Sequence, residues 1–170
     1  MKKSICALVI AALAVPGIAF AGAGGNSCAT AQEIFPSQPY SGDTTGGTSF
    51  IGAFGILPSP GPDASYKFTS DGQVTTGITV TASFNAAAFL VASCNGNAGS
   101  PIESVSASSA AGGTFVLPID NAAPGTALTA GQTYYVIISG NPSDNSGPSG
   151  AYSFTTPSPL PVVLQEFSID

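Results

Sequence analysis

Histidine, tryptophan and arginine are missing from this sequence of 170 residues, and basic residues are rare in it. Lys2, Lys3 and Lys67 are set against nine Asp and Glu residues. Without histidine, neither a Ser-His-Asp nor a Cys-His catalytic arrangement can form. Binding to nucleic acid or to an anionic membrane depends on Lys and Arg, so neither partner is expected.

The first residues have the pattern of a signal peptide. Two lysines precede an apolar run over residues 5–15, and Ala19-Phe20-Ala21 has the small-x-small form of a cleavage site. A membrane anchor is the alternative, but the run is short and Pro16 interrupts it. We therefore expect residues 1–21 to be removed, with no membrane insertion afterwards. The mature protein is expected to be secreted, extracellular or held at the cell surface.

Cysteine is scarce after the signal peptide. Cys6 leaves with the signal peptide, and only Cys28 and Cys94 remain. An even pair in an oxidising compartment predicts a disulfide. Two free thiols or a metal pair are the alternatives, but no histidine or third cysteine is left to complete a metal site.

Alternation with a period of two dominates the rest of the chain. In "GITVTASF", Ile78, Val80, Ala82 and Phe84 share one face and the polar residues share the other, which is typical of a half-buried strand. In "QTYYVIISG" both faces are largely apolar, which indicates a central strand. Turn residues rich in Gly, Pro, Asn and Asp separate such segments. The pattern predicts an all-β protein folded as an antiparallel β-sandwich.

Several segments, taken in order, resemble the bacterial pre-peptidase C-terminal domains. They are "NSCATAQEI", "YSGDTTGGT", "GPDASYKFT", "FLVASCNGN", "LTAGQTYYVIISG" and "SGAYSFTT", which together span residues 26–156. The resemblance implies a jelly-roll-like sandwich over residues 22–156 that is not an enzyme. Members of this family usually accompany secreted enzymes as accessory modules.

The resemblance also implies a possible calcium site, because some members bind calcium through clustered aspartates. Asp63 precedes a family-like strand and is the first candidate ligand, with Asp43 as the second. The segment "CNGN" supplies no carboxylate where many members have Asn-Asp-Asp. As an alternative to metal binding, Asp43 is expected to form a turn, as are Asp71, Asp120 and Asp144. No other cofactor is expected.

The C-terminal segment 157–170, "PSPLPVVLQEFSID", forms a proline-rich linker followed by an apolar strand. The apolar residues of this strand are Val162, Val163, Leu164, Phe167 and Ile169. The strand could fold back as the last strand of its own sandwich, pair with the edge of a neighbouring sheet, or act as a secretion or sorting signal.

Two functions follow from these observations. The first is a non-catalytic module that acts through protein or surface contacts. The second is a structural subunit of an extracellular fibre or surface assembly, which polymerises by donating its C-terminal strand to another copy. Carbohydrate binding would need exposed aromatic rings, but Tyr40 and Tyr135, the two candidates, are expected to pack against the sandwich.

Overall fold

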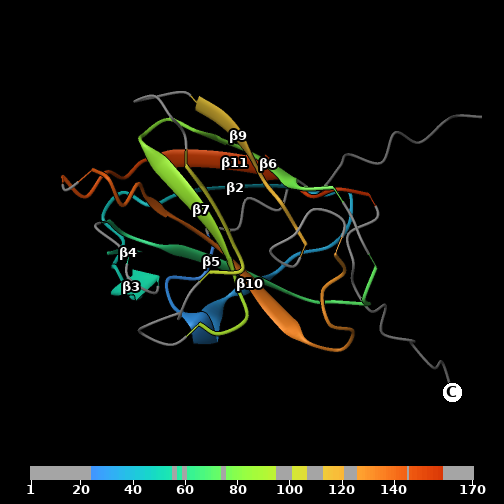
Figure 1. Ribbon diagram of the computed structural model, residues 1–170. Helices are drawn as coiled ribbons and strands as arrows, with labels where there is room; N and C mark the ends of the chain where they lie inside the picture. Colours follow the sequence, from blue (N-terminus) through green and yellow to red (C-terminus); the bar gives the residue numbers. More distant parts are fainter. Residues whose placement is uncertain are drawn as a thin grey trace, which may run out of the picture.

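The computed structural model describes residues 24–54, 57–58, 61–73, 76–94, 101–106, 113–120, 126–144 and 146–158 (Figure 1). These residues form two packed β-sheets, which confirms the predicted all-β sandwich. In the described part, no helix is long and apolar enough to cross a membrane. The signal peptide predicted over residues 1–21 and the apolar strand predicted over residues 162–169 lie outside the described residues.

The first sheet has five strands in the order β1-β5-β10-β7-β8. Only the short β1–β5 pair is parallel, and the other neighbours are antiparallel. The strands are β1 (Gln32–Glu33), β5 (Ala64–Thr69), β10 (Thr133–Gly140), β7 (Ala86–Val91) and β8 (Glu103–Ser106).

The second sheet has four antiparallel strands in the order β2-β11-β6-β9. They are β2 (Pro39–Asp43), β11 (Ala151–Thr155), β6 (Ile78–Ala82) and β9 (Gly113–Leu117). A small hairpin of β3 (Ala53–Phe54) and β4 (Leu57–Pro58) and a 3-10 turn, η1 (Cys28–Thr30), complete the described elements. Along the chain, successive strands of the two large sheets belong alternately to the first and the second sheet. The exception is β7 and β8, which are consecutive strands of the first sheet. Most connections therefore cross from one sheet to the other.

The alternation of apolar and polar residues in the sequence matches the alternation of buried and exposed side chains in the fold. Along β6, Ile78, Val80 and Ala82 are buried, whereas Thr79 and Thr81 are exposed. On this wet face the hydroxyls of Thr81 and Thr114 lie 2.9 Å apart. The apolar face of the strand therefore packs into the sandwich, and its threonines face solvent.

Aromatic rings from both sheets form the centre of the core. The ring of Tyr66 on β5 meets the ring of Phe154 on β11 edge-on, with centroids 4.8 Å apart. The ring of Tyr40 on β2 stacks on Phe154 at 5.2 Å. Contacts of this geometry stabilise a core beyond the burial of apolar area, so these three rings join both sheets at one point.

The outer face of the first sheet is covered by a second apolar cluster, which contains the predicted disulfide. Cys28 and Cys94 are bonded, with their Cα atoms 5.4 Å apart. Ile51, Phe89 and Ile137 belong to the buried residues of this cluster. Because this layer covers β7 and β10, both faces of these strands are buried, as the apolar pattern of β10 predicted.

Candidate functional site

The two sheets end in edge strands on the same side of the sandwich. β1 is an edge strand of the first sheet, and β2 is an edge strand of the second. Residues 34–38, called the arch below, join these two strands directly. The arch thus bridges the gap between the edges of the two sheets.

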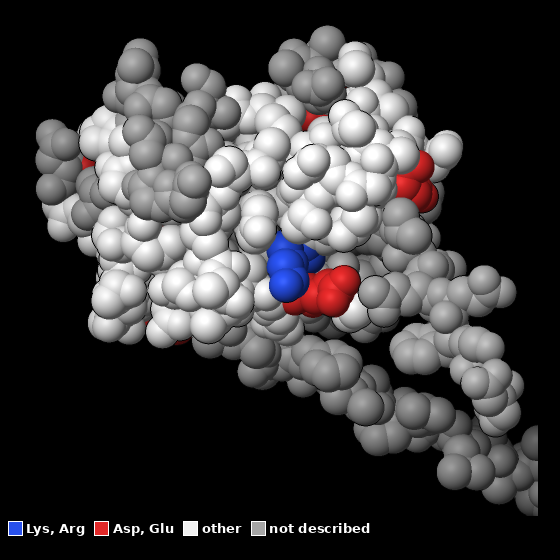
Figure 2. Space-filling view, turned by 90° about the horizontal axis from the view of Figure 1, so that it is seen from below, with Lys and Arg blue, Asp and Glu red and all other residues white. Residues whose placement is uncertain are grey.

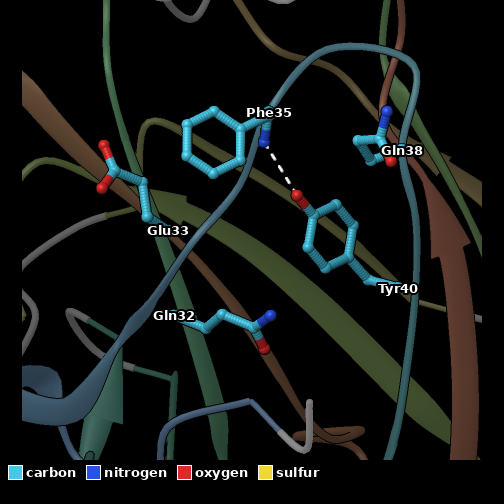
Figure 3. A pocket seen from close by; sticks show the side chains of 5 residues that line it. All are labelled: Gln32, Glu33, Phe35, Gln38 and Tyr40. Carbon is cyan, nitrogen blue, oxygen red and sulfur yellow. Dashed lines mark hydrogen bonds between the residues drawn. The ribbon is translucent and has the colours of Figure 1, made fainter. Parts of the chain in front are cut away.

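This gap forms a cavity of about 490 Å³, called the edge groove below (Figure 3). It is lined by Gln32, Glu33, Phe35, Gln38 and Tyr40. Phe35 is 51% exposed, which is unusual for a large apolar side chain in the described part of this protein. An exposed aromatic ring at the mouth of a groove is typical of a contact surface rather than of a core.

Tyr40 forms the floor of the edge groove. Its side chain is buried, and its hydroxyl accepts a hydrogen bond from the Phe35 backbone N–H at 2.8 Å. Burial raises the pKa of this phenol. The bond connects β2 to the arch. Tyr40 packs in the core, as expected, and does not present an exposed ring to a sugar. Tyr135 is likewise packed against the outer cluster.

Gln32 brings a polar group into the edge groove. Figure 3 shows its side chain extending from β1 toward β2. Its Oε1 atom is buried and accepts no hydrogen bond within the described part of the chain. A buried acceptor without a donor costs about 1–3 kcal/mol.

The end of the sandwich lies against the arch. Thr156 follows β11, and its hydroxyl donates to the Phe35 carbonyl at 2.6 Å and accepts from the Gln38 N–H at 2.9 Å. The Ser37 N–H donates to the Pro157 carbonyl at 3.2 Å. The start of segment 157–170 is thus fixed on the arch, beside the edge groove.

Charge is sparse around the edge groove. Glu33 is the register partner of Lys67 on β5. Lys67 is the only Lys or Arg among the described residues, and Figure 2 shows it as a single blue patch beside an acidic side chain on a largely uncharged surface. Contacts at this edge must therefore depend mainly on apolar burial and backbone hydrogen bonds.

The two predicted calcium ligands line a different cavity, of about 470 Å³, together with Asn26 and Thr44. Asp63 is buried, and its Oδ2 accepts from the N–H groups of Phe50 at 2.9 Å and Ile51 at 3.0 Å. The fold thus brings Asp43 and Asp63 to one cavity and uses Asp63 to hold the loop before β3. Within the described ranges, no group of three or more His, Cys, Asp or Glu side chains could hold a metal ion.

Three of the aspartates expected in turns do form them. Asp43, Asp71 and Asp144 each accept a hydrogen bond from the backbone N–H two residues later, at 2.7, 2.8 and 3.0 Å. Hydrogen bonds from the Thr45 and Ser146 hydroxyls lower the pKa values of Asp43 and Asp144, respectively. The backbone N–H bonds from the same two residues lower these pKa values further. Asp120, the fourth aspartate expected in a turn, has a buried side chain.

Sequence reasoning did not find the edge groove. Its lining residues fall within "QEIFPSQPY", and nothing in that pattern shows that they surround one cavity. Comparison with known proteins adds no assignment, since no family model, no curated protein and no solved structure matches the chain. The resemblance to pre-peptidase C-terminal domains therefore stays a prediction.

Proposed function

We propose that this is a non-catalytic β-sandwich protein, secreted or held at the cell surface, that acts through protein or surface contacts. The observation that carries the proposal is the edge groove, an apolar cavity with an exposed phenylalanine at its mouth. The Cys28–Cys94 disulfide supports an oxidising compartment. The lack of His and Arg in the sequence favours a binding role over catalysis, with proteins or further copies of the chain as partners.

Cell fractionation tests the location. The protein is expected outside the cytoplasm, without residues 1–21 and with no free thiol, as measured by mass spectrometry after alkylation. Recovery only as a reduced cytoplasmic chain would contradict the proposal. A hydrolase panel run on the purified protein tests the absence of catalysis, and sustained turnover by the pure protein would also contradict it.

A second candidate function is a structural subunit of an extracellular fibre or surface assembly. The position of Thr156 and Pro157 favours it, because segment 157–170 begins on the arch and has an apolar second half. An apolar segment on a proline-rich linker can add a strand to a neighbouring sheet. Repetition of that contact is heterologous and forms a fibre.

Light scattering and electron microscopy distinguish the two functions. The full chain and a chain truncated after Ser158 are compared, and thermal unfolding establishes that both are folded. Assembly of the full chain alone supports the subunit function. Two equally stable monomers would leave the contact module as the function and would exclude the subunit.

A further inference from the structure

We propose that the edge groove is the acceptor site for residues 159–170 of a second copy of this chain. This inference rests on the second candidate function and names the surface at which the copies join. The donated strand would lie between β1 and β2, on the rim formed by Phe35 and over the floor formed by Tyr40.

The edge groove offers what an added strand needs. β1 has only two residues and is an edge strand, so the backbone on its outer side faces no other strand of the described sheet. β5 continues to Thr69, whereas β1 ends opposite Lys67. An extended segment can satisfy the groups of such an edge and bury its own apolar side chains between the sheets.

The C-terminal segment has the matching pattern. In an extended chain one face carries Val163, Phe167 and Ile169. The other face carries Val162 and Leu164, followed by the charged Glu166 and Asp170. Residues 166–170 therefore have one apolar face suited to a groove and one polar face, whereas residues 162–164 are apolar on both faces. β-branched and aromatic residues also favour the strand conformation.

The position and direction of the chain end favour the groove of another copy. β11 runs antiparallel to β2, and the chain leaves β11 beside the arch, where Thr156 donates a hydrogen bond to Phe35 and Ser37 donates one to Pro157. Pro157, Pro159 and Pro161 favour an extended path after this contact, because proline restricts both itself and the residue before it. Twelve extended residues reach about 40 Å, which is enough to cross to a neighbouring copy.

Cysteine crosslinking of the full chain tests which copy supplies the strand. Gln38→Cys in the groove and Phe167→Cys in the tail are made singly, and the two proteins are mixed under mild oxidation. We expect disulfide-linked dimers that contain one of each variant. Thr79→Cys, which is exposed on the outer face of β6, is the matched control and should give few dimers with Phe167→Cys. Equal crosslinking of both pairs would overturn the inference.

The double variant Gln38→Cys/Phe167→Cys tests the chain's own tail as the occupant. A ladder of interchain multimers is expected. An intrachain disulfide in a monomer, identified by peptide mapping, would show that the tail folds back and would overturn the proposal.

A matched pair of surface substitutions tests the groove without crosslinks. Phe35 and Val116 are both 51% exposed, and Val116 lies on β9, at the other edge of its sheet. Phe35→Asp should weaken assembly at least tenfold, as measured by the concentration at which multimers form, whereas Val116→Asp should not. A free peptide of residues 159–170 should compete with assembly of the unmodified full chain.

These outcomes separate the inference from the function on which it rests. If the full chain assembles but Phe35→Asp assembles as well as Val116→Asp, the copies join at another surface. The edge groove is then not the acceptor site, but the subunit function still holds. If the full chain never assembles, the subunit function and this inference fall together.

Discussion

Tyr66 and Tyr152 place their hydroxyl oxygens 2.7 Å apart inside the sandwich, although the two residues belong to different sheets. The Tyr152 hydroxyl also accepts from the Gly24 N–H at 3.3 Å. This pair joins β5, β11 and the N-terminal end of the described chain, and both tyrosine side chains are buried. Two polar groups are thereby accommodated in the core, because one hydroxyl donates a hydrogen bond to the other.

Removal of either hydroxyl should destabilise the fold. Tyr66→Phe and Tyr152→Phe each leave one buried hydroxyl with fewer partners, so we expect a loss of about 1–2 kcal/mol in each case. The double variant should lose less than the sum, because no hydroxyl is then left behind. Urea unfolding measures the free energy of unfolding of the two single variants and of the double variant. Strict additivity would mean that the two hydroxyls are not coupled.

Stability should fall in alkaline solution. Burial raises the pKa values of Tyr66, Tyr152 and Tyr40 above the ordinary value of 10.0, with the neighbouring Tyr152 phenol adding to the effect on Tyr66. The unfolded chain releases these protons above pH 10 while the folded chain keeps them. The stabilisation is therefore complete below pH 10 and declines above it, by up to about 1.4 kcal/mol per tyrosine and pH unit.

Tyrosinate absorbance and circular dichroism, followed together during a pH titration, measure this effect. Part of the tyrosinate signal should appear only when the β-sheet signal is lost. Full tyrosine titration with the sheet intact would contradict the prediction.

The disulfide should make a large contribution to stability. The bond between Cys28 and Cys94 closes a loop with a sequence separation of 66 residues. The chain-entropy model gives about 4 kcal/mol for a loop of this size. The double variant Cys28→Ala/Cys94→Ala should lose about that amount in chemical unfolding. A reducing agent should destabilise the original protein and leave the variant unchanged.

Asp63 should be structural whether or not a metal binds. Its Oδ2 atom holds the N–H groups of Phe50 and Ile51, so Asp63→Ala should cost about 2–3 kcal/mol even with a chelator present. Asp43→Ala, at an exposed turn, is the comparison and should cost less. If calcium binds in the shared cavity, it should raise the melting temperature of the original protein and of neither variant. A calcium shift that survives both substitutions would exclude these two ligands.

The β-sandwich, its disulfide and the burial of individual strands could be predicted from the sequence. Alternation in β6 identified its buried face, and apolar residues on both faces of β10 identified a central strand. These features are local, because side chains of a strand point to opposite faces with a period of two. The disulfide followed from counting, since only two cysteines remained to pair.

Other features depend on contacts between distant segments. The sequence could name Asp43 and Asp63, but only the fold places them on one cavity and commits Asp63 to the loop before β3.

The edge groove likewise exists only because both sheets end on the side where the arch joins them. The sequence alone determined which residues face inward, because that choice depends on the alternation of each strand. The tertiary structure decided which edge stays open and where the chain end leaves, because these depend on how the strands are ordered in two sheets.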